Sequence, residues 1–142
     1  MTEPEQAKIV QGFFDHLVAK DLPAFLALWA RDAVIEMPFT APGFPARIEG
    51  EAALREFWTG AQANAASLAF DNLRIEALAA PGWWMSRQEG RIQTLDGKPY
   101  NNRYVCLFEI VDGRLQTYHE YYNPLVVMET FGQPVAEAAA AQ

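Results

Sequence analysis

Apolar side chains in the first half of the chain recur every three to four positions, the spacing that gathers them on one face of an α-helix. One such run spans residues 9–18, and Thr2 stands three positions before Glu5, which is a capping-box pattern for a helix start. A second helix is predicted over 21–32 and a third over 51–66. The N-terminal part of the chain is therefore expected to form three amphipathic helices.

From residue 68 onward the hydrophobic period changes to two, which is typical of β-strands. Pro-Gly and Asp-Gly pairs are turn signals, and they separate four long predicted strands, at about 68–79, 83–95, 100–111 and 114–123. Because each strand leads into the next through a tight turn, the sheet is predicted to be antiparallel.

Strands of this length have to curve as well as twist, so three helices can cover their concave face. The predicted fold class is α+β: a cone-shaped domain with a curved antiparallel sheet wrapped around three N-terminal helices, and a cavity at its open end. A short strand over 33–39, a proline-rich loop over 41–45 and a short helical segment over 124–131 complete it. We assign residues 1–132 to a single domain and expect the Ala-rich tail, 133–142, to be frayed.

Charge and cysteine content exclude several kinds of partner. The net charge of −7 disfavours nucleic acid, because an acidic surface repels phosphate. Cys106 is the one cysteine, so no internal disulfide and no cysteine-based metal cluster can form. His16 and His119 have no partner at ligand spacing, and we predict no metal and no cofactor. Neither a secretory signal nor a membrane-spanning run is present in the sequence, so we predict no membrane contact and a cytoplasmic location.

Four stretches together resemble the NTF2-like superfamily, in its SnoaL-like and ketosteroid-isomerase-like branches. They cover residues 28–38, 96–104, 112–115 and 120–124. The resemblance extends over nearly the whole chain and implies the cone-shaped fold described above. It does not choose a function, since this fold carries isomerases, cyclases, dehydratases, hydrolases and binding proteins.

The resemblance to ketosteroid isomerases does not extend to their catalytic groups. Their catalytic aspartate corresponds to Met37, and their two oxyanion donors correspond to Phe13 and Cys106. None of these three side chains can perform the same proton transfer or donation, so steroid isomerisation by that mechanism is not expected. Cys106 is interpreted as a small hydrophobe rather than a nucleophile.

Limonene-type epoxide hydrolases of the same superfamily resemble this chain in an Arg-x-Asp pair and a later Asp, here Arg87, Glu89 and Glu120. That family register points Met85, Arg87 and Glu89 into the cavity, although the hydrophobic pattern alone places Trp84 and Ile92 inside. We follow the family register, which puts Trp84 on the convex face of the sheet. Phenazine-biosynthesis dimer proteins resemble the chain at Glu120 alone.

Strand parity selects the remaining pocket residues, because positions i and i+2 share a face. Tyr118 and Tyr122 lie on the face of Glu120, and the resemblance points Glu36 inward as well. The residues predicted to contact a ligand are Tyr118, Tyr122, Tyr104, Asn102, Cys106, Phe108, Glu36, Met37, Phe13 and Met85.

The functional prediction is a cofactor-independent acid/base enzyme of isomerase, cyclase, dehydratase or epoxide-hydrolase type, acting on a small, mostly apolar molecule in the cone. Glu120 is the predicted base, Glu89 its acid counterpart, and Arg87 orients both. The alternative is a non-catalytic module of the same fold that binds a small ligand or serves assembly. A homodimer is expected from the resemblance and from Trp84.

Overall fold

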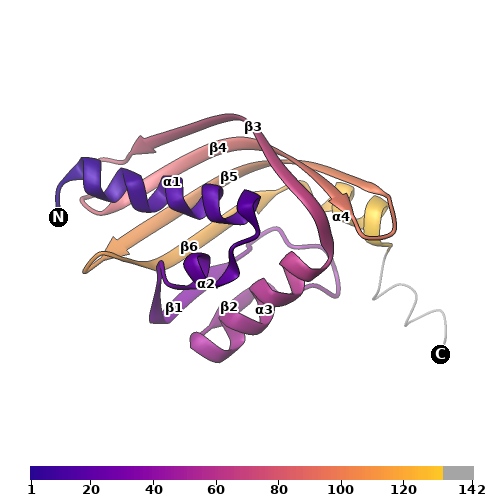
Figure 1. The fold of residues 1–142 in the computed structure, drawn as a ribbon, viewed down its shortest axis with the longest axis horizontal. Coiled ribbons are helices and arrows are strands. Elements are labelled where there is room, and N and C mark those ends of the chain that lie inside the picture. The colour runs from indigo at the N-terminus through magenta and orange to yellow at the C-terminus, as the bar shows by residue number, and fades with distance from the viewer. Residues whose placement is uncertain (133–142) are drawn as a thin grey trace.

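The computed structural model describes residues 1–132, and the predicted frayed tail lies outside the described residues. The elements are α1 (Glu3–Ala19), α2 (Leu22–Leu26), β1 (Trp29–Glu36), β2 (Arg47–Glu49), α3 (Glu51–Ala63), β3 (Ala65–Ala77), β4 (Trp83–Thr94), β5 (Pro99–Val111), β6 (Arg114–Tyr122) and α4 (Pro124–Phe131). The α+β class, the three N-terminal helices and the four long strands are confirmed. Figure 1 shows the sheet curving past α1 and α3, with α4 at one end of the long strands.

The sheet has the strand order β2-β1-β6-β5-β4-β3. Its neighbours pair antiparallel with one exception, because β1 runs parallel to β6. The antiparallel pairing predicted for the four long strands is confirmed, and no pairing was predicted for the short strand β1. The turns along the later strands force antiparallel pairing, whereas β1 is joined to β6 through α3 and four intervening strands, which leaves its direction free.

The largest difference from the predicted boundaries lies between the second helix and the first strand. Helix α2 ends at Leu26, and Trp29 already begins β1, because Trp29, Ala33 and Ile35 are buried in the alternating manner of a strand. Strand β2 was not predicted, since three residues are too few to show a period.

Helix α1 begins as the capping box predicts and buries its apolar face against the sheet. The Thr2 hydroxyl accepts from the Glu5 backbone N–H at 3.3 Å, and the Glu5 carboxylate accepts from the Thr2 N–H at 2.7 Å. Phe13 lies at the centre of the core, with ring centroids at 5.0 to 6.2 Å from those of Phe14, Phe25, Trp29, Trp58, Phe108 and Tyr118. This aromatic cluster fixes α1, α2 and α3 against the concave side of the sheet.

Trp84 belongs to the core and not to the convex face. Its side chain is buried, and its indole N–H donates to the side-chain oxygen of Gln6 at 2.9 Å. The prediction of Trp84 as part of a dimer surface is therefore wrong, and the homodimer stays a prediction without that support.

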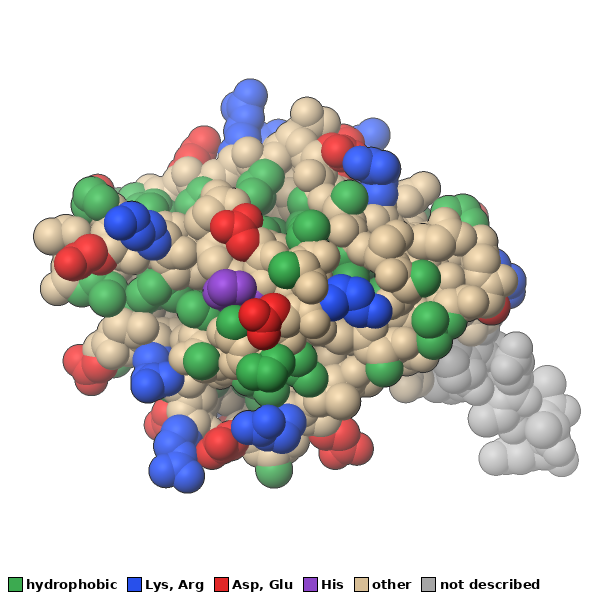
Figure 2. Space-filling view, in the orientation of Figure 1, with side chains coloured by type: hydrophobic (Ala, Val, Ile, Leu, Met, Phe, Trp, Pro, Cys, Tyr) green, Lys and Arg blue, Asp and Glu red, His purple; other side chains and the backbone are tan. Residues whose placement is uncertain are grey.

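The outer surface carries charges of both signs. Acidic and basic side chains are interspersed over the face drawn in Figure 2. Among the described residues, no helix is long and apolar enough to cross a membrane.

Candidate functional site

A cavity of about 540 Å³ lies between the concave face of the sheet and helices α1 and α3. The loop over 40–45 contributes Thr40, Phe44 and Pro45 to its wall, and α4 contributes Val127 and Phe131. These two segments are the proline-rich loop and the short helix that were expected near the open end of the cone. Most of the wall is apolar, so the polar groups that reach the cavity define its chemistry.

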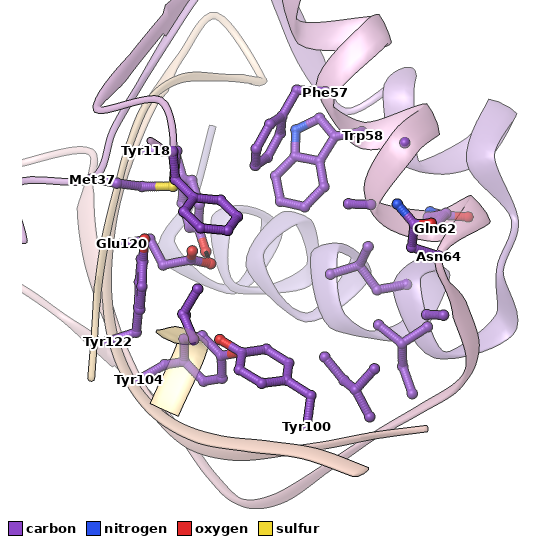
Figure 3. A pocket seen from close by; sticks show the side chains of 18 of the residues that line it. Met37, Phe57, Trp58, Gln62, Asn64, Tyr100, Tyr104, Tyr118, Glu120 and Tyr122 are labelled. Atoms are coloured by element: carbon purple, nitrogen blue, oxygen red, sulfur yellow. Dashed lines mark hydrogen bonds between the residues drawn. The ribbon is translucent and has the colours of Figure 1, made fainter. Parts of the chain in front are cut away.

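Glu120 is the carboxylate on the sheet side of this cavity. It lies on β6 between Tyr118 and Tyr122, and all three side chains line the cavity as strand parity predicts. Tyr118 donates its hydroxyl proton to Glu120 Oε1 at 2.8 Å. Figure 3 shows the Glu120 carboxyl group pointing into the cavity next to Met37 and Tyr118.

The environment of Glu120 disfavours its charge. Loss of solvent raises the pKa of Glu120 from 4.5 to about 7, and the hydrogen bond from Tyr118 opposes this rise only in part. Among residues 1–132, those that line the cavity include no lysine, arginine or histidine that could stabilise the carboxylate. A carboxyl group with this pKa is half ionised near neutral pH, which suits it to accept and return a proton.

A chain of hydrogen bonds on the inner face of the sheet leads from Gln88 to Glu120. Gln88 Nε2 donates to Cys106 Sγ at 3.5 Å, and Cys106 Sγ lies 3.2 Å from the Tyr118 hydroxyl. Because the Tyr118 hydroxyl donates its proton to Glu120, its oxygen accepts a hydrogen bond from the Cys106 thiol. Burial raises the pKa of Cys106 to about 12, so Cys106 is a protonated donor in this chain and not a nucleophile.

A second polar group lies on β5. Tyr100 and Tyr104 both line the cavity, and the Tyr104 hydroxyl donates to the Tyr100 hydroxyl oxygen at 3.4 Å. Asn102 is buried between them and donates from Nδ2 to the Tyr100 hydroxyl oxygen at 2.9 Å. Elsewhere on the wall, the Tyr122 hydroxyl lies 2.9 Å from the Thr40 hydroxyl.

The prediction that Met85, Arg87 and Glu89 face the cavity is wrong. Arg87 is exposed, and Glu89 accepts from Asn72 at 3.3 Å and pairs with Arg103 at 3.8 Å on the outer face of the sheet. The register between β4 and β5 explains the difference. Trp84, Ser86 and Gln88 stand opposite Phe108, Cys106 and Tyr104, so they share the inner face, and the intervening residues point outward.

Glu36 also faces outward, contrary to prediction. The inward positions are Ile35 on β1 and Met37 directly after it, both of which are buried, and Met37 reaches the cavity. Glu36 pairs instead with Arg47 at 2.5 Å and with His119 at 3.4 Å on the outer side. It is therefore separated from Glu120 by the sheet, and the two carboxylates do not share a proton.

Three other predicted contacts lie behind the cavity wall. Cys106 and Phe108 are fully buried in the core, and Asn102 acts on the cavity through Tyr100 rather than by lining it. Phe13 does line the cavity, as an apolar surface. Strand parity correctly placed Asn102, Cys106 and Phe108 on the inner face of β5. It did not show that these three side chains lie behind the residues that line the cavity.

Several cavity residues were not predicted. Tyr100 shares the β5 face of Asn102 and Tyr104, so its position two residues before Asn102 could have identified it as a cavity residue. Gln88 was placed on the outer face by the family register. Trp58 and Gln62 lie one helical turn apart on α3 and reach the cavity together, but a helical period cannot separate a cavity position from a core position.

Gly90 on β4 makes room for Tyr104. A Cβ atom at this position would lie 2.8 Å from Tyr104 Cε2 and 3.7 Å from Phe70 Cε1. Gly90→Ala is expected to displace the Tyr104 ring and to lower the free energy of unfolding by roughly 1 to 3 kcal/mol in urea denaturation. Gly60→Ala on α3 is the control, since its Cβ would meet nothing within 4 Å, and it is expected to be neutral or to stabilise the helix by up to about 1 kcal/mol. Equal effects of the two variants would contradict the close packing of Gly90 against Tyr104.

Among residues 1–132, no group of three or more His, Cys, Asp or Glu side chains is arranged to hold a metal ion. The polar groups that line the cavity are the carboxyl groups of Glu120 and the exposed Glu56, phenol and threonine hydroxyls, and side-chain amides. Such a set can move protons and donate hydrogen bonds.

Residues 10–118 match the SnoaL-like domain family. The uncharacterised Bacillus subtilis protein YesE is 31% identical over 144 residues, which cover 93% of this chain and 91% of YesE. A crystal structure of a Bacillus subtilis protein proposed to be an isomerase superimposes with a TM-score of 0.85 and 29% identity, covering 94% of this chain and 97% of that one.

A Pseudomonas putida protein proposed to be a polyketide cyclase superimposes with a TM-score of 0.70 and 19% identity, over 88% of this chain and 96% of that chain. At this identity the similarity establishes the fold alone. The NTF2-like architecture predicted from the sequence is thereby confirmed, since a Burkholderia xenovorans NTF2-like protein also superimposes with a TM-score of 0.72.

Proposed function

Because the chain belongs to the SnoaL-like domain family, we propose that it is a cofactor-independent enzyme that moves a proton within a small, mostly apolar molecule held in its cavity. The observation that carries this proposal is Glu120, a carboxyl group in an apolar cavity with its pKa near 7. In its ionised form Glu120 accepts a proton from carbon, and in its protonated form it returns one. The proposed isomerase and polyketide cyclase among the structural relatives favour this class of reaction.

The epoxide-hydrolase type is not part of this proposal, because its Arg-x-Glu pair lies on the outer face of the sheet. Glu120 acts without a second carboxylate at hydrogen-bond distance. Tyr118 holds Glu120 Oε1, which leaves Oε2 for the substrate. Burial raises the pKa of Tyr118 well above its ordinary value, so Tyr118 stays protonated and serves to orient Glu120.

The test is proton exchange at carbon in an apolar ketone. With 2-tetralone in D₂O, the wild-type protein is expected to catalyse loss of the α-proton signals in ¹H NMR. The rate is expected to rise about tenfold per pH unit below pH 7 and to level off above it, because only ionised Glu120 accepts the proton.

Arg87→Gln and Glu89→Gln are the controls, since both side chains lie on the outer face. Each is expected to keep the exchange rate within about twofold of wild type, as surface substitutions away from a site do. Saturable binding of ketones with no exchange above the buffer background would contradict the enzyme proposal and favour a non-catalytic binding module.

A further inference from the structure

The orientation of the Asn102 side chain is fixed by its neighbours. Asn102 Oδ1 accepts from the backbone N–H of Arg103 at 2.8 Å and from that of Asn123 at 3.0 Å. Backbone N–H groups only donate, so the oxygen of the amide has to face them. Nδ2 therefore points the other way and donates to the Asn123 carbonyl at 3.0 Å and to the Tyr100 hydroxyl oxygen at 2.9 Å.

This arrangement leaves the Tyr100 proton free. The Tyr100 oxygen accepts from Asn102 and, at 3.4 Å, from Tyr104, so its own O–H has to donate elsewhere. Within residues 1–132, no side-chain or backbone acceptor takes that proton. The other phenols of the cavity are engaged, since Tyr118 donates to Glu120 and Tyr122 is paired with Thr40.

The free hydroxyl lies in the polar part of the cavity. Figure 3 shows the Tyr100 hydroxyl end and the Glu120 carboxyl group both reaching into the cavity, with Trp58 and Gln62 across from them. Burial raises the pKa of Tyr100 to about 12, and the charge of nearby Glu120 contributes to this rise. Tyr100 is therefore a neutral donor near pH 7, where Glu120 ionises.

We propose that Tyr100, held by Asn102 and Tyr104, donates a hydrogen bond to the carbonyl oxygen of the substrate, and that the substrate class is an enolisable apolar ketone or related carbonyl compound. This assignment rests on the proposed function of Glu120 and names the substrate for it. A donor opposite a base is what enolisation requires, because negative charge develops on the oxygen as the carbon loses its proton.

The proposed step is a proton transfer from carbon to Glu120. The α-carbon gives its proton to Glu120, and the electron pair of the C–H bond forms the C=C bond of the enolate. The π electrons of the carbonyl move to its oxygen, which accepts the Tyr100 hydrogen bond. Return of the proton from Glu120 to the same or to another carbon completes exchange or isomerisation without any further reactant.

Tyr100→Phe removes the hydroxyl and keeps the ring. In the 2-tetralone assay this variant is expected to lower kcat for exchange by about 100-fold and to change KM by less than about threefold, as loss of one oxyanion donor does. The preference for binding 2-tetralone over its hydrocarbon analogue tetralin is expected to fall by about tenfold. Tyr121→Phe is the matched control, since Tyr121 lies on the other face of the sheet against Phe39.

The two measurements separate the donor from the base. An unchanged exchange rate in Tyr100→Phe, or an unchanged preference for the ketone, would overturn the role of Tyr100 while leaving Glu120 as the base. Absence of exchange in the wild-type protein, together with a ketone preference that Tyr100→Phe removes, would support the donor and contradict the proposed function.

Discussion

Glu120→Gln is expected to lower the rate of 2-tetralone exchange by about 10³-fold or more while the protein stays folded. Glutamine has nearly the shape of glutamate but no basic oxygen, and general-base catalysis by a positioned side chain contributes about 10² to 10⁴ in rate. The amide oxygen still accepts from Tyr118, whose hydroxyl donates to Glu120 at 2.8 Å in the native protein. The cavity and its closing segments are therefore expected to remain intact.

Three readouts define this result. Exchange is followed by ¹H NMR, folding by circular dichroism, and the affinity for tetralin reports the shape of the cavity. Glu89→Gln carries the same chemical change on the outer face and is expected to behave as wild type. Exchange by Glu120→Gln within tenfold of the wild-type rate would exclude Glu120 as the base.

The second large effect is on stability and depends on pH. The pKa of Glu120 is raised from 4.5 to about 7 in the folded protein, so the folded state binds more protons than the unfolded state between these values. The contribution of Glu120 to stability is therefore fully present below pH 4.5, falls as the pH rises through 7, and is lost above it. The shift corresponds to about 3 kcal/mol.

Glu120→Gln lacks this titration. The free energy of unfolding of the variant, minus that of the wild type, is expected to increase by about 3 kcal/mol between pH 4.5 and pH 8, measured by urea denaturation. In thermal unfolding this corresponds to a shift of roughly 5 to 10 °C in the difference between the two Tm values. A difference that stays constant over this range would show that Glu120 titrates as an ordinary exposed carboxyl group.

Comparison with the variant is necessary because other carboxyl groups act in the opposite direction. Hydrogen bonds from Arg91 lower the pKa of Asp71, and a hydrogen bond from Thr94 lowers that of Asp96. Such groups contribute stability at higher pH that is lost as the pH falls through their lowered pKa values. They are present in both proteins, so the difference between wild type and variant isolates Glu120.

On β4 the hydrophobic pattern and the family register predicted opposite faces to be buried. The alternation of apolar and polar residues places Trp84 and Ile92 inside, and the structure confirms Trp84 as core, whereas the family register had turned the strand over. The hydrophobic pattern is a direct physical signal of burial. A register carried over from a distant relative is not, because one residue of slip exchanges the two faces of a strand.

The position of Glu120 in the cavity was predicted correctly, because strand parity joins it to two tyrosines and the family resemblance points this face of the strand inward. Tyr100 was missed, although the same parity links it to Asn102 and Tyr104 on β5. Tyr100 is distinguished by a hydroxyl proton that no acceptor in the described part of the chain takes. This feature depends on hydrogen bonds between Asn102 on β5 and the backbone of Asn123, which follows β6 and lies 21 residues further along the chain. A sequence pattern reports which face a residue occupies, but the partners of its polar atoms depend on tertiary contacts.

The end of the cavity formed by Phe44, Val127 and Phe131 shows a further limit. These residues come from a loop and from a short helix, where no period reports burial. Their packing decides the volume available to a ligand. Strand parity therefore predicted part of the polar wall of the cavity, namely Glu120, Tyr118, Tyr122 and Tyr104, whereas the closure of the cavity depends on tertiary packing.

The most direct test of the proposed function of Glu120 is the titration of its carboxyl group. In protein labelled with ¹³C at the glutamate carboxyl carbons, the Glu120 resonance is assigned as the signal that disappears in Glu120→Gln. Followed from about pH 4 to about pH 9, it is expected to titrate with a midpoint near pH 7. A midpoint near the ordinary value of 4.5 would contradict the desolvated base on which the proposed function depends.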